Sequence, residues 1–524
     1  MISNLYSTLT PRKRFSIATA GSALALSGLL VTGTAQATTS LVAAAQTPAV
    51  LATYTQGLTL TTHATVPSGE TASIASLTTS STHGVVTKVS STSVTYYPGS
   101  YYASLAKGST ATDKFSFCLT DTGGDSSCST VTVTVYGAAA ATASTTTTAS
   151  TSYTCVRNWY VAQNGSDKAA GSSATTPWLT LQHADTSGLL KAGDCVNVAN
   201  GTYPMTSTAY LNTGGSSNSA TGYIVYRSIN PHGAKIQASA VGMGDMINAM
   251  GNYMIFDGFE IDGGNLGLIS LPMTTGSCLI GQGHHFQVLN SLVHDCGGEA
   301  IGAMFHDWYT FVGNTVYNNA HFSLYQASGI SIYEPRAVTF TATAADTAAT
   351  YHILVKNNVS HDNGEWYVAG DHSDGNGIIM DDFRNSQTGH AAYPYTALVQ
   401  GNTSYNNGGR GIHVFSTDNI TVDSNIVYNN NLDDLIIGPW RGELSNVGGN
   451  NNTWTNNQAA ATSVSTDAQR QYNTAVLDAD ATNVNVTWSN NANIDTRTGG
   501  KSYLIGNTTR AATFPTYNPL GKAL

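Results

Sequence analysis

Charged residues are scarce in this chain of 524 residues: they make up 10% of it, and the formal net charge is -10. Without a basic patch or stripe, the chain lacks the electrostatic surface that binds nucleic acid. No apolar run after Val31 is long enough to span a bilayer. None of the six cysteines sits in a C-x-x-C pair, which argues against a zinc or redox site. Gly, Ser, Thr, Asn and Tyr are abundant instead, and this composition suits an extracellular all-β protein.

The N-terminus carries the features of an export signal. A basic patch, Arg12-Lys13-Arg14, is followed by a largely apolar run over residues 17–31 and then by Ala35-Gln36-Ala37. This order predicts a secretory signal over residues 1–37 that is cleaved after Ala37. We therefore expect the mature protein to be secreted.

The cysteines fall into three pairs that are close in sequence. In an exported chain such pairs are compatible with disulfide bonds, although spacing alone does not prove the connectivity. The pairs are Cys118 with Cys128, Cys155 with Cys195, and Cys278 with Cys296.

Short alternating segments between residues 48 and 137 predict a small β-sandwich. Residues 93–97, 114–118 and 131–136 are predicted strands. Their order resembles the bacterial immunoglobulin-like or cadherin-like modules of secreted enzymes and adhesins, which implies a role in spacing or attachment. An Ala/Ser/Thr tract over 138–152 predicts a flexible linker, and residues 153–524 form the predicted main domain.

The main domain is organised around a short apolar sequence motif, which we call the repeated phrase. It occurs five times between Glu299 and Trp440. Its copies are too close for a crossover helix between strands, but they leave room for three short strands joined by turns. This repeat predicts a β-solenoid in which equivalent positions of successive coils lie about 4.8 Å apart. Two interior columns are predicted: Ile301, Ile330, Ile378, Ile412 and Leu435 in one, and Ile332, Met380, Val414 and Ile437 in the next.

A second phrase places asparagine at two recurring positions. Stacked asparagines can hydrogen-bond their own copies in the next coil, so both columns are predicted to be structural. One column contains Asn314, Asn358, Asn402 and Asn425, and the other contains Asn318, Asp362, Asn406 and Asn429.

Three segments at the start of the main domain resemble the opening of secreted right-handed parallel β-helix proteins, and they come in the same order. They are residues 159–167, 177–181 and 192–203. Pectate lyases of polysaccharide lyase family 9 share this opening with other lyases and hydrolases. The resemblance implies an all-β chain, a right-handed parallel β-helix preceded by a small β-sandwich, but it does not identify a reaction.

Four carboxylates gather around one strand of the repeat. Like charges so close together repel one another, so we expect a cation to balance them, and calcium, which takes several oxygen ligands, is the natural candidate. The alternative is a set of solvated turn carboxylates near Arg384 and Arg410. The four carboxylates are Asp371, Asp374, Asp381 and Asp382.

The resemblance to family 9 implies roles for these residues. In that family calcium on the β-helix surface binds an acidic sugar, and a basic side chain removes the proton beside the uronate carboxylate. Carried over, Asp374, Asp381 and Asp382 would hold calcium, with Asp371 or Asp362 as additional ligands. Arg410 would be the base and His413 would help it. The family uses lysine as the base, whereas this chain has no lysine between Lys356 and Lys501.

Hydrolysis by paired carboxylates is the competing mechanism. The succession of Asp374, Asp381-Asp382, Arg410 and His413 loosely resembles that of the β-helical polygalacturonases, although the Gly-His-Gly and Arg-x-Lys pieces of that family are missing. One carboxylic acid would protonate the leaving oxygen while another carboxylate activates water, and Asp382 would be catalytic beside Arg410 and His413.

The remaining predictions concern the substrate and its partners. Four residues around the centre are expected to bind sugar: Glu334, Tyr333, Arg384 and Trp440. The sequence thus predicts a secreted, monomeric polysaccharide-degrading enzyme, foremost a calcium-assisted lyase of an acidic polysaccharide and alternatively a glycoside hydrolase. A non-catalytic glycan-binding protein or adhesin is the third possibility.

Overall fold

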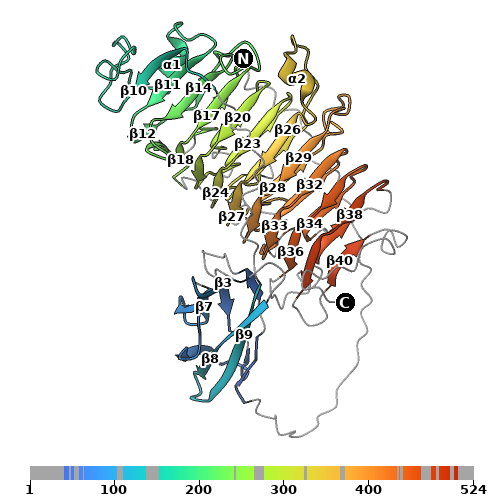
Figure 1. Ribbon diagram of the computed structural model, residues 1–524. Coiled ribbons are helices and arrows are strands. Elements are labelled where there is room, and N and C mark those ends of the chain that lie inside the picture. Colours follow the sequence, from blue (N-terminus) through green and yellow to red (C-terminus); the bar gives the residue numbers. More distant parts are fainter. Residues whose placement is uncertain are drawn as a thin grey trace, which may run out of the picture.

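We describe the protein from a computed structural model, drawn in Figure 1. The predicted export signal, the predicted linker, Asp371 and Trp440 lie outside the residues that the structure describes. Those residues are 40–46, 49–51, 58–62, 64–98, 100–102, 105, 110–136, 153–240, 243–264, 276–323, 327–365, 372–433, 436, 441–461, 474–478, 483–495 and 501–505.

The N-terminal part is a small β-sandwich, as the sequence predicts. One sheet has the order β2 (Ala49–Leu51), β9 (Ser126–Tyr136), β8 (Thr110–Asp121) and β5 (Ala72–Thr78). The other has the order β3 (Leu58–Thr61), β7 (Ser93–Tyr97) and β6 (Val85–Lys88). Beside them lie the pair β1 (Val42–Ala43) and β4 (Ala64–Thr65) and a 3-10 turn at Ser100–Tyr102. The immunoglobulin-like or cadherin-like identity of this module stays a prediction.

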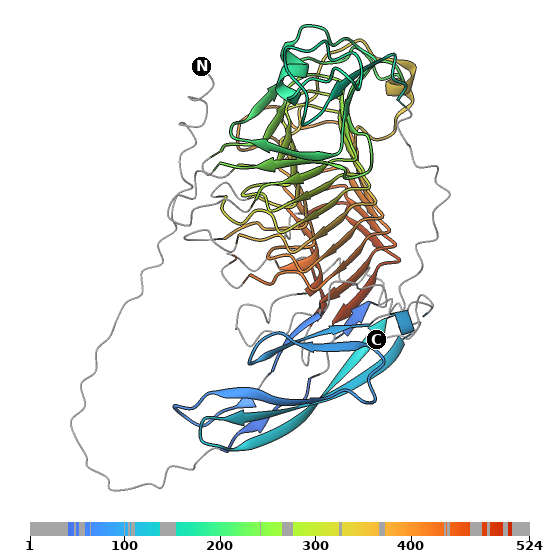
Figure 2. The same cartoon turned by 90° about the vertical axis from the view of Figure 1, so that its left-hand side faces the viewer.

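The main domain is a right-handed parallel β-helix, which confirms the predicted fold class. Each coil adds one short strand to each of three parallel sheets, so neighbouring strands in a sheet come from successive coils (Figure 2). The first solenoid sheet consists of β10 (Arg157–Val161), β11 (Asp194–Val198), β14 (Ile224–Ser228), β17 (Met254–Asp257), β20 (Phe286–Leu289), β23 (Tyr309–Val312), β26 (Ile353–Lys356), β29 (Ala397–Gln400), β32 (Ile420–Asp423), β35 (Thr453–Thr455) and β38 (Thr487–Ser489).

The other two sheets follow the same order of coils. The second solenoid sheet consists of β12 (Gly201–Met205), β15 (Ala234–Ala238), β18 (Glu260–Asp262), β21 (Leu292–His294), β24 (Thr315–Tyr317), β27 (Val359–His361), β30 (Thr403–Tyr405), β33 (Ile426–Tyr428), β36 (Gln458–Ala461) and β39 (Ala492–Asp495). The third solenoid sheet consists of β13 (Ala209–Leu211), β16 (Ile247–Ala249), β19 (Leu279–Gly281), β22 (Ile301–Met304), β25 (Ile330–Tyr333), β28 (Ile378–Asp381), β31 (Ile412–Phe415), β34 (Gly442–Val447), β37 (Thr474–Asp478) and β40 (Lys501–Ile505).

Two short helices interrupt the coils. α1 (Leu181–Thr186) lies at the N-terminal end of the solenoid, and the Thr180 side chain accepts a hydrogen bond from its first turn. α2 (Ala344–Ala348) belongs to an insertion, and Thr343 and Asp346 form a capping box at its start. Within the described residues, neither helix has the length and apolar character needed to cross a membrane.

The interior of the solenoid is built from the predicted apolar columns. The side chains of Ile301, Ile330, Ile378 and Ile412 are fully buried and in register. Period-2 alternation therefore separated interior from surface positions correctly over these four coils.

The last predicted member of each column was wrong. Leu444 of β34, and not Leu435, is the register partner of Ile412, and Asn446 takes the place predicted for Ile437. The chain makes a longer turn here before the strand begins: Ile436 forms an isolated bridge with His372, and Leu435 and Ile437 lie outside the described residues. The sequence around Leu435 resembles the repeat, but the strand begins later in the chain, so the repeat pattern predicted the wrong interior residues.

Asparagine ladders join the coils, as predicted. Asn358 donates from its backbone N–H and from Nδ2 to Oδ1 of Asn402, at 2.9 and 3.0 Å, and Asn402 repeats both bonds to Asn425. The first ladder contains the four predicted asparagines and continues through Asn457 and Asn491. A buried amide whose donors and acceptor are all paired in this way satisfies the turn without water.

The second ladder is displaced by one residue from its predicted position. Its members are Asn319, Asn363, Asn407 and Asn430. The predicted column is structural for another reason: Asn318, Asp362, Asn406 and Asn429 all have φ angles between 54° and 58°, the left-handed region that Asn and Asp tolerate best.

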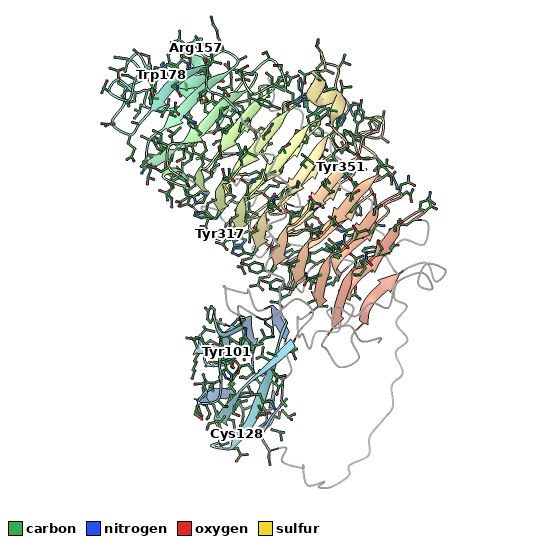
Figure 3. All side chains as sticks on the ribbon, viewed as in Figure 1. Tyr101, Cys128, Arg157, Trp178, Tyr317 and Tyr351 are labelled. Carbon is green, nitrogen blue, oxygen red and sulfur yellow. A yellow bond between two sulfur atoms is a disulfide. The ribbon has the colours of Figure 1, made fainter. Side chains whose placement is uncertain are left out.

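An outward column of the second sheet consists of stacked rings. The rings of Tyr317, labelled in Figure 3, and His361 lie 5.2 Å apart and almost parallel, and those of His361 and Tyr405 lie 4.7 Å apart. Tyr405 and Tyr428 belong to the same buried apolar cluster as the sandwich core, which covers this end of the column. Because each ring covers its neighbour's face, the column is not a platform for sugar rings.

The three disulfide bonds match the cysteine pairs noted in the sequence. Cys118–Cys128 joins β8 to β9, Cys155–Cys195 ties the start of the main domain to β11, and Cys278–Cys296 closes one coil. Each bond therefore fixes a local stretch of chain.

Removing one ladder amide should destabilise the solenoid. In Asn402→Ala, the buried N–H and Nδ2 groups of Asn358 lose their acceptor, so we expect the free energy of unfolding to fall by roughly 1–3 kcal/mol. Asn230→Ala, at an exposed asparagine, should change it by less than about 0.5 kcal/mol. Urea denaturation of both variants checks this, and equal losses would show that the ladder adds nothing specific.

Candidate active site

The third sheet carries most of the predicted site residues, but the structure places them at opposite ends of its strands. Tyr333 and Asp381 are register partners at the carboxyl ends of β25 and β28. Arg410 lies two residues before β31, whose last residue, Phe415, pairs with Asp381. Five residues of strand, about 16 Å, therefore separate Arg410 from that end of the sheet. The structure does not bring the predicted base together with Asp381 and Asp382.

Glu334 and Asp382 begin the turns that leave the third sheet, and both are fully buried. The carboxylate of Asp382 accepts hydrogen bonds from Ser386 Oγ at 2.8 Å and from Gln387 N at 2.9 Å. Glu334 accepts one from Thr388 N at 3.0 Å. These bonds give both carboxylates the task of holding the loop after β28, and their roles as catalytic, metal or sugar-binding groups stay predictions.

The other predicted sugar-binding residues at this end are only partly exposed. Nε and Nη2 of Arg384 donate to the two carboxylate oxygens of Asp418 at 2.9 and 2.6 Å, a bidentate pair that ties the guanidinium to the turn after β31. Tyr333 is half-buried, and burial, with the charge of Glu334, raises the pKa of its hydroxyl well above the ordinary value. Asp381 beside it is also half-buried.

Arg410 and His413 lie inside the protein, with 2% and 3% of their surfaces exposed. Nη1 of Arg410 donates to the backbone oxygen of Ser373. Burial lowers the pKa of Arg410 to about 10; the Asp374 carboxylate opposes this shift and Arg441 adds to it. Burial and the charge of Arg410 lower the pKa of His413 well below the ordinary value, so its imidazole is neutral. At this level the outward face of the sheet is covered.

Glu365 is a buried acid beside Arg410 that the sequence analysis did not single out. Its Oε2 accepts hydrogen bonds from Ser373 N at 2.9 Å and Asp374 N at 3.2 Å. Burial, followed by the charge of Asp374, raises its pKa well above the ordinary value. Among the described residues no group hydrogen-bonds its Oε1. Glu365 belongs to no motif, so only its surroundings distinguish it.

The amino ends of the third-sheet strands carry a second set of polar residues, which we call the edge column. Each member lies two residues before the first apolar residue of its strand, and register stacks the members one coil apart. The edge column contains Asp245, Ser277, Glu299, Ser328, Asn376 and Arg410.

Two carboxyl groups of the edge column converge on the serine between them. Oδ1 of Asp245 accepts a hydrogen bond from Ser277 N at 2.9 Å, and the Ser277 hydroxyl donates to Oε2 of Glu299. The backbone N–H of Glu299 donates back to Ser277 Oγ at 3.1 Å. Both acids are half-buried, so each keeps some access to solvent.

The surroundings of this pair raise the pKa of both acids. Burial raises the pKa of Asp245, and the donors Ser277 N and Asn248 oppose that shift. Burial also raises the pKa of Glu299, the Ser277 hydroxyl opposes it, and the charge of Asp245 adds to it. Because an ionised carboxylate disfavours ionisation of its neighbour, the charge of Asp245 adds to the rise in the pKa of Glu299.

The sequence contains a signal for this pair that was only half used. Glu299 appears as the residue before the first copy of the repeated phrase. Asp245-Met246-Ile247 and Ser277-Cys278-Leu279 follow the same spacing in the two preceding coils, before the first of the five copies of the repeated phrase. A search for earlier and weaker copies would have found Asp245.

The predicted calcium ligands do not converge among the described residues. Asp382 is occupied by hydroxyl and N–H donors, and Asp374 accepts a hydrogen bond from Asn376 Nδ2 at 3.0 Å. Asp371 lies outside the described residues. This donor set does not fit a calcium ion, so we derive no catalytic step through one.

A different cluster offers three ligand atoms to a metal. Atoms of Glu260, Asp262 and His294 on the second sheet lie within 4.8 Å of one another. Nζ of Lys235 lies 3.0 Å from Glu260 Oε1 and 2.6 Å from Asp262 Oδ2. Its ammonium group already balances the two carboxylates, so a metal ion would have to displace it.

No protein-family model and no curated protein matches the chain. Solved structures similar to it include pectate lyase Pel9A, at 13% identity and a TM-score of 0.34 over 66% of this chain and 68% of that one. The A-module of Azotobacter vinelandii mannuronan C-5 epimerase AlgE4 has 11% identity and a TM-score of 0.28 over 62% and 92%. GH136 lacto-N-biosidase from Eubacterium ramulus has 13% and 0.32 over 67% and 67%. Similarity at this level transfers no residue's role to this chain.

Replacing Glu365 with glutamine should alter the pH dependence of stability. Because its pKa is raised, the folded protein keeps this proton at pH values where the unfolded chain has lost it, so its contribution falls as pH rises above the unfolded value of about 4.3. Glutamine cannot ionise. The difference in thermal midpoint between Glu365→Gln and wild type should therefore shift in favour of the variant from about pH 5 to about pH 8. A difference that stays constant with pH would contradict this.

Proposed function

We propose that the protein is an exported enzyme that cleaves a polysaccharide by acid–base catalysis at Asp245 and Glu299. The observation that carries this proposal is the convergence of two half-buried acids with raised pKa values on one serine. The export signal and the resemblance of the domain opening to secreted β-helix enzymes support a polysaccharide as the substrate. A long solenoid edge suits a polymer that lies across several coils.

The two acids would take different parts in hydrolysis. Glu299, in its protonated form, would donate its proton to the leaving glycosidic oxygen. Asp245, whose ionised form accepts from Ser277 N, would remove a proton from the water that attacks the anomeric carbon. The backbones of the two acids are two strand spacings apart, about 9.6 Å, and both carboxyl groups reach the serine between them.

Elimination with Arg410 as the base is a second candidate. The lowered pKa of Arg410 favours it, because a neutral guanidine is then easier to form. With 2% of its surface exposed, however, the side chain has no open path to a bound sugar in this conformation. Calcium-assisted lysis of an acidic polysaccharide therefore ranks below hydrolysis.

Amide variants of the pair should abolish cleavage without unfolding the protein. We expect Glu299→Gln and Asp245→Asn each to lower the rate of reducing-end release from a responsive polysaccharide by roughly 10²–10⁴-fold. Asp362→Asn is the matched control, because asparagine occupies the equivalent position in neighbouring coils, and it should keep full activity.

The reaction products distinguish the hydrolase, the lyase and the non-catalytic binding protein. New reducing ends without ultraviolet absorbance support hydrolysis. Unsaturated, absorbing ends that disappear on chelation would instead establish the calcium-assisted lyase. Retention of glycans with no product from any neutral or acidic polysaccharide would leave a binding protein and overturn the enzyme proposal.

The pH profile of hydrolysis should be bell-shaped. Activity falls at low pH because Asp245 must be ionised, and at high pH because Glu299 must be protonated. Since both pKa values are raised, both limbs should lie above the ordinary range of carboxylic acids. Measurements of kcat/KM against pH check this, and a maximum below about pH 4 would exclude this assignment of roles.

A further inference from the structure

A groove with a mixed polar and apolar lining lies on the first solenoid sheet, away from the edge column. It has a volume of about 680 Å³, within the range of sites that bind small ligands. The start of the main domain forms one wall, and the Cys155–Cys195 disulfide fixes that segment to β11. The groove is lined by Tyr153, Asn158, Tyr160, Asn197, Arg227, Ser228, Ile229, Pro231, Asp257, Gly258 and Asn290.

One row of the groove is set by strand register. Tyr160, Asn197, Arg227 and Asp257 are successive register partners, so their backbones follow one another at about 4.8 Å. A pyranose ring is about as wide as one strand spacing. A sugar chain lying across the strands would therefore meet a new planar side chain at each coil.

Hydrogen bonds hold the planar groups of this row in place. Asn197 is buried, donates from Nδ2 to Asn158 Oδ1 at 3.0 Å and accepts at Oδ1 from Arg227 Nε at 2.7 Å. Asp257 accepts from the Tyr153 hydroxyl at 2.7 Å and from Asn290 Nδ2 at 2.9 Å. Groups positioned before a ligand arrives lose little conformational entropy on binding.

The charges and apolar surfaces of the groove indicate the kind of ligand. Arg227 and Asp257 are the charged side chains of the lining and are adjacent, so their charges offset each other. The half-buried rings of Tyr153 and Tyr160 and the exposed Ile229 offer apolar surface beside the polar groups. Fixed hydrogen-bonding groups next to aromatic rings suit the hydroxyls and the C–H faces of uncharged sugars.

We propose that this groove is a non-catalytic binding site for uncharged sugar units of a polysaccharide. The choice of a carbohydrate ligand rests on the proposed function, whereas the site itself lies on another face of the solenoid from Asp245 and Glu299. Binding here would keep the protein on its polymer while the edge column acts elsewhere along the chain.

Affinity electrophoresis of the full chain carrying Glu299→Gln tests the groove without cleavage. Soluble β-glucan and xylan serve as neutral probes, and polygalacturonate and alginate as acidic ones. Tyr160→Ala and Arg227→Met should weaken retention by a neutral probe about tenfold. Asn158→Ala, at an exposed residue, should weaken it without affecting folding. Tyr101→Ala, on the sandwich and 61% exposed, is the control that should keep full retention.

The outcomes separate this proposal from the proposed function. Retention that depends on Tyr160 and Asn158, in a wild-type protein that releases no product, would support the groove and overturn the enzyme. Unchanged retention in all three groove variants, loss of retention in Tyr101→Ala, or binding to acidic probes alone would overturn the groove proposal.

Discussion

Stacking of the coils is the constraint on which every other feature of this protein depends. Parallel strand pairing sets the spacing along three sheets, and the asparagine ladders repeat the same spacing at the turns. A buried amide that bonds its copy above and below leaves no polar group unpaired, so the turn cannot shift without breaking several bonds at once. Residues tens of positions apart in sequence thereby become fixed neighbours.

This rigid spacing creates both proposed sites, but the sites depend on different physical effects: raised pKa values in one and fixed hydrogen-bonding side chains in the other. At the edge column, stacking brings Asp245 and Glu299 to one serine, and burial raises the pKa of each acid. In the groove, stacking lines up planar side chains, and hydrogen bonds to neighbouring coils hold them still. One site is organised to move a proton and the other to present fixed donors and acceptors.

Loops decide which of the outward columns remain accessible. The strand alternation directs His413 away from the core, yet it is 3% exposed. Arg410 beside it is also enclosed, and the Glu365 carboxyl lies next to Arg410. The sandwich does the same on the second sheet, where it covers Tyr405 and Tyr428. A solenoid therefore offers many columns, and the insertions between strands select among them.

The sequence by itself determined the fold class, the interior columns through Ile412, the first asparagine ladder and the cysteine pairs, because these depend on period-2 alternation and on a repeat that is visible locally. It also showed Glu299 in its column. Only the tertiary structure decided that Leu444 replaces Leu435, that Asp382 holds a loop, that Arg410 is enclosed and that Asp245 faces the same serine as Glu299. The physical reason is that the length of each turn, the burial of side chains under loops and their desolvation depend on how the whole chain packs. The repeat pattern does not specify these properties.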